Sequence, residues 1–140
     1  MSREIKFRAK SLKTNEFVFG FFGQRTETSP VRETTQTYTI NYILVDNGFC
    51  GFEEIEIDIK TLGQYTGLLD KNGKEIYEGD VVFSESNQYY KQDEIVWDCY
   101  DMGWDIGKKD SWKLRSPMSS KTEIIGSIYE NPELIGGGNG

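Results

Sequence analysis

The sequence predicts a mainly β protein made of two clusters of short antiparallel strands with few or no helices. Apolar and polar residues alternate along much of the chain; Ile55, Ile57 and Ile59, for example, are separated by acidic residues. Strict alternation is typical of strands that bury one face. No long segment carries the apolar stripe of an amphipathic helix, and Asn-Gly, Ser-Pro and Gly-rich signals mark frequent turns.

The first cluster is the N-terminal β region, residues 1–62. Its strands are predicted from alternation around 5–9, from Phe17, Phe19 and Phe21 sharing one face, and from similar patterns over 38–44 and 55–59. Residues 24–35 are polar, contain Ser29-Pro30, and are expected to form an exposed loop.

Residues 63–80 are expected to be a turn-rich connector. Asn72-Gly73 can adopt positive φ at both central positions of a tight hairpin turn. Glu78-Gly79-Asp80 provides a second sharp bend before the next strand begins.

The second cluster, residues 81–135, is predicted to contain about five short strands and is compatible with an SH3-like small barrel. The strands are expected at 81–83, 94–98, 104–106, 112–114 and 123–129. A polar loop is expected over 84–92. The last strand is apolar on both faces and is therefore predicted to be central. A short helical turn follows at Asn131-Pro132, and residues 136–140 form a Gly-rich tail that is expected to be flexible.

The composition places limits on size and partners. With 140 residues the chain forms one domain or two small units that share an interface or self-associate. The net charge of −7 disfavours phosphate backbones and anionic lipids as partners. Two basic islands stand out from this acidic chain, each with five cations and one anion, over residues 1–13 and 107–121. They are interpreted first as solvated surface, and otherwise as a patch for self-assembly or for an acidic partner.

The chain contains no histidine. This removes the commonest general acid/base at neutral pH and both Ser-His-Asp and Cys-His catalysis. It also disfavours zinc, copper and non-haem iron sites. We therefore expect no enzymatic activity, no catalytic residues and no cofactor.

The two cysteines, Cys50 and Cys99, are too few for a disulfide framework. They are expected to be free, partly buried thiols in a reducing cytoplasm. The N-terminus lacks the features of a signal peptide, and no apolar run is long enough to span a membrane.

The sequence offers several groups of residues as candidate sites. The segment 64–82 has two interpretations. In the structural one, Gly67, Gly73 and Gly79 supply unusual backbone angles, and Asp70 caps its turn through the Asn72 and Gly73 amides. In the alternative, the segment forms a binding surface of Tyr65, Thr66, Asp70 and Tyr77. The structural role is favoured. A calcium loop beginning at Asp70 lacks the required spacing. Asp98, Asp101 and Asp105 could bind Mg²⁺ if they converge; otherwise they lie at solvent positions in a turn.

The aromatic residues of the second cluster suggest a further surface. Trp97, Trp104 and Trp112 are expected in strands, where filling a small barrel is their favoured role and a stacking platform the alternative. The candidate binding surface combines exposed tyrosines with the second basic island: Tyr89, Tyr90, Tyr100, Lys108, Lys109, Lys113 and Arg115.

Three blocks resemble the YopX family of phage and prophage proteins. They are Arg3–Ala9, the long segment from Gly63 to Val82, and Ile125–Leu134, in the same order as in the family. The resemblance implies a small β-rich protein with an SH3-like C-terminal barrel, and it implies no activity or catalytic residues. Residues 20–55 match nothing specific in the family.

These observations predict a non-enzymatic phage or prophage accessory protein in the host cytoplasm that acts through protein–protein contact or forms homo-oligomers. A nucleic-acid-binding module that uses the aromatic and basic surface is the alternative, disfavoured by the overall acidity. A carboxylate-based metal hydrolase ranks third.

Overall fold

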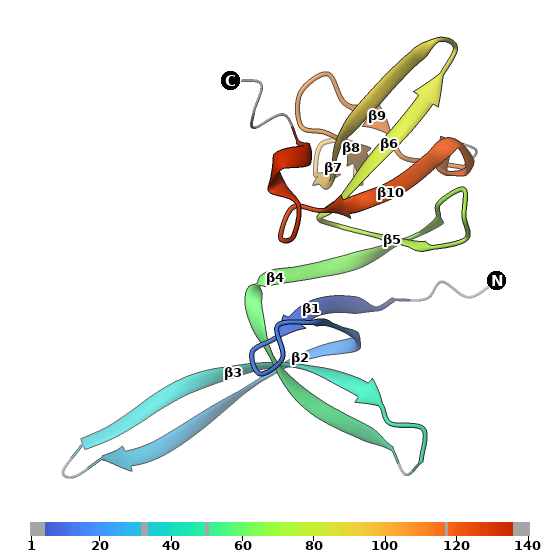
Figure 1. The fold of residues 1–140 in the computed structure, drawn as a ribbon. Coiled ribbons are helices and arrows are strands. Elements are labelled where there is room, and N and C mark those ends of the chain that lie inside the picture. The colour runs from blue at the N-terminus through green and yellow to red at the C-terminus, as the bar shows by residue number, and fades with distance from the viewer. Residues whose placement is uncertain (1–4, 32–33, 50, 117, 136–140) are drawn as a thin grey trace. The chain divides into compact units, whose positions relative to one another are not determined.

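The computed structural model describes residues 5–31, 34–49, 51–116 and 118–135. It is mainly β, as predicted; in the described part the helical elements are two 3-10 turns, η1 (Met118–Lys121) and η2 (Pro132–Leu134) (Figure 1). The chain divides into two compact units, one spanning Ile5–Gly63 and the other running from Gln64 onward. The expected flexible tail at 136–140 lies outside the described residues. No helix in the described part is long and apolar enough to cross a membrane.

The N-terminal unit is an antiparallel sheet. It contains β1 (Phe7–Ser11), β2 (Phe17–Val31), β3 (Thr34–Asp46) and the first part of β4 (Phe52–Leu69), in that spatial order. The alternation in these strands directs a small apolar core to one side. The core consists of Ala9, Ile43 and Ile57, with Phe7, Val18, Phe22, Val45 and Leu62 packed against it.

The predicted phenylalanine face of β2 is not the core face. Phe19 and Phe21 are exposed, whereas Val18 and Phe22 contact the core. Both faces of this segment are apolar, so alternation alone could not choose between them. Gly20 lies on the core side, where a Cβ atom would stand 2.0 Å from the Leu44 carbonyl oxygen. A glycine at this position therefore permits the close approach of β3.

The loop expected at 24–35 is wrong: the described residues of this segment, 24–31 and 34–35, belong to a long two-stranded ribbon. β2 and β3 pair without interruption from Phe21↔Leu44 to Val31↔Thr34. We call the part beyond the Arg25↔Ile40 pair the arm. It extends away from β1 and β4 within the N-terminal unit (Figure 1). Alternation signals a strand only when one face is buried, and in the arm most side chains on both faces are exposed.

The C-terminal unit contains a second antiparallel sheet. It consists of β6 (Asp80–Ser86), β7 (Tyr89–Asp98), β8 (Gly103–Ile106), β9 (Trp112–Lys113) and β10 (Thr122–Ser127), in the order β10-β6-β7-β8-β9. The short β5 (Glu75–Tyr77) pairs with the end of β4. The sheet curves around a core of Ile76, Val82, Ile95, Trp104, Ile106 and Leu114, with Leu68, Trp112 and Ile124 packed against it. Five short strands are consistent with the small barrel that was predicted.

The polar loop expected at 84–92 is also wrong. β6 and β7 continue to a tight turn at Asn87-Gln88, with φ values of 47° and 73°. Positive φ at both central positions is the geometry of a type I′ hairpin turn, which fits the twist of the strands. Gln at the second position is unusual in such turns, so Asn87-Gln88 is only a weak turn signal.

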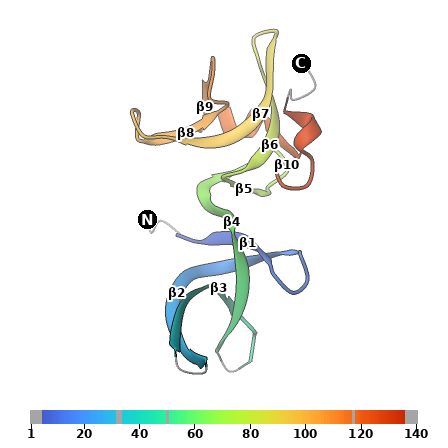
Figure 2. The same cartoon turned by 90° about the vertical axis from the view of Figure 1, so that its left-hand side faces the viewer.

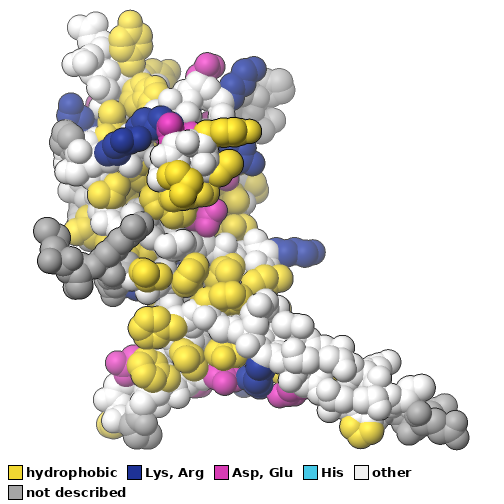
Figure 3. Space-filling model, turned by 180° about the vertical axis from the view of Figure 1, so that it is seen from behind, with side chains coloured by type: hydrophobic (Ala, Val, Ile, Leu, Met, Phe, Trp, Pro, Cys, Tyr) yellow, Lys and Arg dark blue, Asp and Glu magenta, His cyan; other side chains and the backbone are white. Residues whose placement is uncertain are grey.

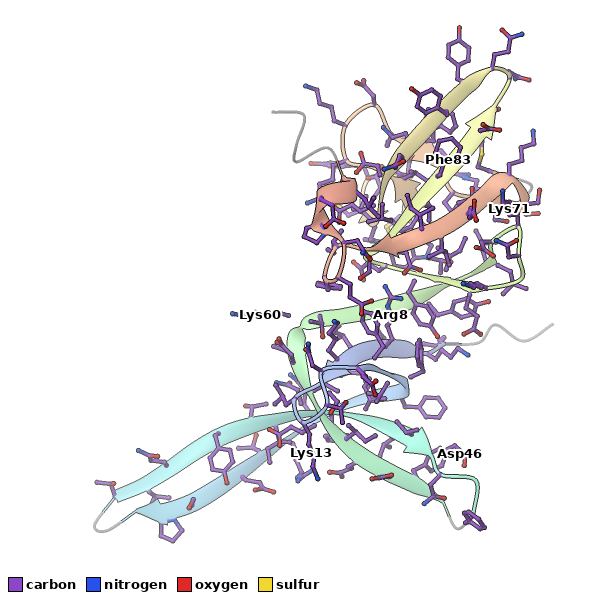
Figure 4. The ribbon with its side chains drawn as sticks, viewed as in Figure 1. Arg8, Lys13, Asp46, Lys60, Lys71 and Phe83 are labelled. Carbon is purple, nitrogen blue, oxygen red and sulfur yellow. The ribbon has the colours of Figure 1, made fainter. Side chains whose placement is uncertain are left out.

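The last strand is at a sheet end rather than central. β10 pairs with β6 alone in the sheet order, but its outer side is not open. The backbone N–H of Lys71 donates to the Thr122 carbonyl oxygen at 2.8 Å, and the Ile124 N–H donates to Asp70 Oδ2 at 3.1 Å. Figure 4 shows Lys71 in the turn beside β10. The connector thus covers the edge, which leaves less of it open to pairing with another strand.

Asp70 organises this turn, although not as predicted. Its Oδ1 accepts hydrogen bonds from the N–H groups of Asn72 (2.8 Å) and Lys74 (2.9 Å), while the Gly73 N–H donates to the Asp70 backbone carbonyl. Gly73 has a φ of 81°, but Asn72 is not among the residues with positive φ. The turn is therefore a four-residue turn closed by a left-handed glycine instead of a type I′ turn at Asn72-Gly73.

Burial and hydrogen bonding shift the pKa of the Asp70 carboxyl in opposite directions. Burial raises the pKa, but the N–H groups of Ile124, Lys74 and Asn72 stabilise the charged form and leave the pKa below its ordinary value. A carboxyl whose folded pKa is lowered stabilises the fold above its unfolded pKa of about 4, and this contribution is lost as the pH falls through the folded value.

We predict that Asp70→Asn destabilises the protein by about 2 kcal/mol at neutral pH, because the amide NH₂ group would face the Ile124 N–H and leave it without an acceptor. The difference from wild type should shrink as the pH falls below about 4. Urea unfolding across a pH series measures both effects. Asp110→Asn, at an exposed loop position, is the control. An Asp70→Asn variant as stable as this control at neutral pH would contradict the assignment.

Candidate functional site

Three carboxylates converge at one end of the β7–β8 hairpin. Asp98 ends β7, Asp101 lies in the following turn and Asp105 is on β8. One carboxylate oxygen of each lies within 4.8 Å of the others. The sequence could not decide whether these residues converge, because their approach depends on the turn and on the β7–β8 register.

The ammonium group of Lys113 lies among these carboxylates. Its Nζ is 3.3 Å from Asp98 Oδ2 and 3.1 Å from Asp105 Oδ2, and it also pairs with Asp101. The position of Lys113 follows from the pairing of Asp105 with Lys113 across β8 and β9. Ser111 Oγ donates a further hydrogen bond to Asp105 Oδ2 at 3.3 Å. The cluster thus ties β7, β8 and β9 together.

The pKa values of the Asp98 and Asp105 carboxyl groups are shifted in opposite directions. The pKa of Asp98 is lowered, first by a hydrogen bond from the Tyr100 N–H, with Lys113 contributing as well. The pKa of Asp105 is raised, first because the group is buried and second because it shares a hydrogen bond with Asp98. Separated pKa values are typical of acid/base pairs. Here, however, the Asp105 side chain is 4% exposed, which leaves little access for a substrate.

The tip of the β6–β7 hairpin carries two of the predicted surface tyrosines. Tyr89 and Tyr90 are 73% and 71% exposed, and Tyr90 stacks on Phe83 with ring centroids 5.7 Å apart. Figure 2 shows how far this hairpin reaches beyond the rest of its sheet. A hollow lies on each side of the tip, of about 490 Å³ and about 690 Å³. Lys71 and Lys121 line the first hollow, and Lys91 lines the second.

The structure brings only part of the predicted surface together. Lys113 also lines the second hollow, but its ammonium group is held by the aspartates. Lys108, Lys109 and Arg115 are exposed in the loops around β9, and Lys91 Nζ donates to the Lys109 carbonyl oxygen. Tyr100 is 96% exposed but lies beyond the opposite end of β7 from Tyr89. The candidate surface drawn from the sequence omitted Lys71, which is distant from the second basic island, and Lys91, which is isolated within β7. Lys121 belongs to that island but was not included in the candidate surface.

The three tryptophans do not form a stacking platform. Trp104 is buried in the core and Trp112 packs against it, which is the role favoured from the sequence. Trp97 is half-exposed and contacts Trp104 edge-on, with ring centroids 5.0 Å apart. These two rings line a small hollow with Gln64 and Glu78, and burial raises the pKa of the Glu78 carboxyl.

The segment 64–82 has a structural arrangement. Tyr65, Thr66 and Tyr77 are buried, and Thr66 Oγ1 donates to the Ile76 carbonyl oxygen at 2.8 Å. Both carboxylate oxygens of Asp70 accept backbone hydrogen bonds, so they are committed to the turn. Cys99 is free, as expected, but exposed instead of partly buried; Cys50 lies outside the described residues.

Comparison with known proteins agrees with this architecture. The family model described as YopX protein matches residues 6–136. The structure is similar to the crystal structure of protein EF1440 from Enterococcus faecalis, with a TM-score of 0.51 and 22% sequence identity, covering 96% of this chain and 99% of the other. At that identity the likeness concerns the fold alone. A search of curated proteins gives no significant match.

Together, these features define a small antiparallel β protein with two sheet-forming units joined by one long strand. The match over nearly the whole chain shows that it belongs to the YopX family.

We predict that Lys113→Met lowers the melting temperature by a few degrees, because it leaves three carboxylates close together without a cation. The variant should also be stabilised by millimolar Mg²⁺ or Ca²⁺, which would replace the lost charge. Differential scanning fluorimetry with and without metal tests both effects. Lys108→Met, at an exposed position, is the control. Equal stabilisation of the wild type by metal would instead show that the aspartates bind a cation in the presence of Lys113.

Proposed function

We propose that this chain is a non-enzymatic accessory protein of a phage or prophage, working in the host cytoplasm through protein–protein contact and self-assembly. The observation that carries the proposal is the arm. Its residues do not belong to the core of the N-terminal unit, and most of its described side chains are exposed. A two-stranded ribbon is marginally stable by itself, so a long one gains most from a protein surface that pairs with it or covers it.

The character of the arm supports a protein partner. Figure 3 shows mostly neutral polar side chains along it, with charged groups near its base. Arg25 forms ion pairs with Glu27 and with Glu54, so these charges are already balanced. Such a surface lacks the clustered lysines and arginines that would attract a phosphate backbone.

The chemistry available in the C-terminal unit supports a non-enzymatic role. The chain has no histidine, and its converged carboxylates surround a lysine instead of an open position. Family membership supports the phage or prophage setting through the resemblance in all three sequence blocks.

We predict that the full chain self-associates and that an arm-shortened variant is monomeric. In this variant residues 26–39 are replaced by Asn-Gly, so that a two-residue turn closes on the Arg25–Ile40 pair. Sedimentation velocity over a concentration series measures the association. Because the core is untouched, the variant should still unfold cooperatively and give a β-type dichroism spectrum, with less strand signal than the wild type because the strand residues of the arm are gone. A full chain that is monomeric up to about 100 µM, where a contact worth about 5.5 kcal/mol would be half-formed, contradicts the proposal.

A second candidate function is nucleic-acid binding at the β6–β7 tip. The supporting observation is a pair of exposed tyrosines between hollows lined by Lys71, Lys91 and Lys121. Exposed aromatic rings flanked by cations suit single strands, whose bases stack on the rings.

If this candidate is correct, the chain binds short single-stranded oligonucleotides at low salt, and joint Tyr89→Ala and Tyr90→Ala replacement weakens binding by about ten-fold or more. Fluorescence anisotropy measures the affinity. Tyr100→Ala removes a tyrosine that is even more exposed, beyond the other end of β7, and is the matched control. Absence of binding at low salt, where attraction to phosphates is strongest, eliminates this function.

A further inference from the structure

The two outer edges of the arm differ. Strand pairs alternate between those that exchange backbone hydrogen bonds and those whose N–H and C=O groups point outward. Pro30 pairs with Thr35 and has no N–H, so it fits the ladder at a position that faces outward. By the same alternation, the other outward-facing positions are Thr26 and Thr28 on β2 and Thr35, Thr37 and Thr39 on β3.

The β2 edge is protected against further pairing. Pro30 removes one outward donor, and the charged residues Arg25 and Glu27 lie on the same strand. Proline and charge are the usual devices by which proteins prevent an edge strand from pairing with another chain.

The β3 edge has no such device. Residues 34–45 contain no charged residue and no proline, and β-branched threonines dominate the outer half. The pairing of β3 with β4 runs from Asp46 to Tyr42, so no described strand pairs with the outward side of Thr35, Thr37 and Thr39. An open and neutral edge is a template for one more strand.

The neutrality of this edge favours a second copy of the same chain. In a two-fold antiparallel contact each residue near the axis faces its own counterpart or a close neighbour, so a charged edge would repel itself. The β3 edge carries no charged residue over 34–45, so two copies of it would not repel each other. It also offers no charge that would select a basic or an acidic partner.

We infer that the β3 edge pairs antiparallel with the β3 edge of a second copy, with the two-fold axis at Thr37. This inference rests on the proposed self-assembly and specifies its contact. Among the registers that the alternation permits, this one uses all three outward threonines: Thr37 faces Thr37 of the second copy, and Thr35 faces its Thr39. It forms about six backbone hydrogen bonds, two for each facing pair. Threonine pairs across antiparallel strands are themselves favourable.

The first test compares proline at two positions of one pair. Thr37→Pro removes an outward N–H from the β3 edge, and Thr28→Pro removes the outward N–H of its cross-strand partner on the β2 edge. Neither change removes a backbone hydrogen bond within the arm, and each removes the same side-chain hydrogen bond between the Thr28 and Thr37 hydroxyls, so that loss is common to the two variants. Sedimentation velocity should show association weakened about ten-fold or more by Thr37→Pro and within about two-fold of wild type for Thr28→Pro.

The second test uses disulfide trapping in a background with Cys50→Ser and Cys99→Ser. Facing residues of a hydrogen-bonded pair have Cα atoms about 5.5 Å apart, within the range of a disulfide. Thr37→Cys should therefore give a covalent dimer under mild oxidation, whereas Thr28→Cys should not. This readout remains available if a proline variant folds poorly.

The outcomes separate this inference from the proposed function. A wild-type chain that stays monomeric overturns both. Association that the arm-shortened variant loses, but that Thr37→Pro leaves intact, overturns the edge while supporting the arm. Equal trapping of Thr37→Cys and Thr28→Cys overturns the register.

Discussion

The C-terminal unit depends on one carboxylate that is almost enclosed by backbone. Burying a charge is costly unless hydrogen bonds replace its water, and Asp70 receives three of them from N–H groups. Two of these groups lie in its own turn and the third is on β10, far along the chain. The same side chain therefore fixes the local turn and holds the last strand against the connector. Asp80 acts similarly nearby, since its Oδ2 accepts the Tyr77 N–H at 2.7 Å and secures the bend before β6.

The part of the fold that could be predicted from the sequence is the part in which burial of one strand face makes apolar and polar residues alternate. Alternation records burial of one face, and so it located the strands around Ile43, Ile57, Val82 and Ile95. It could not detect the arm, where threonines form strands with most side chains of both faces in water. Nor could it place the turn at Asn87-Gln88, whose residues are not the usual ones for positive φ. The convergence of Asp98, Asp101 and Asp105 depends on the turn and on the β7–β8 register. The place of Lys113 among them depends on the β8–β9 register, and the register of such short strands cannot be read from the sequence.

Charged residues that are neighbours in the sequence have different roles in the folded protein. The basic island at 107–121 looked like one surface, but its residues serve different ends: Lys113 neutralises a carboxylate cluster, while Lys108, Lys109 and Arg115 face solvent. The exposed tyrosines were likewise divided between the two ends of β7. The arm, by contrast, is a mostly neutral polar stretch, and most of its described side chains are exposed. Charged and aromatic residues can be located in a sequence directly. An unpaired strand edge can be located only once the pairing of the strands is known.

The placement of the tryptophans has a practical consequence. All three indoles are on β7, β8 and β9, and the chain from Ile5 to Gly63 has none. Intrinsic fluorescence excited at the red edge of the ultraviolet band therefore reports on the C-terminal sheet alone, while far-ultraviolet dichroism averages over both sheets. Following one denaturation by both signals shows whether the two halves of this molecule lose their structure as a single cooperative system or in succession.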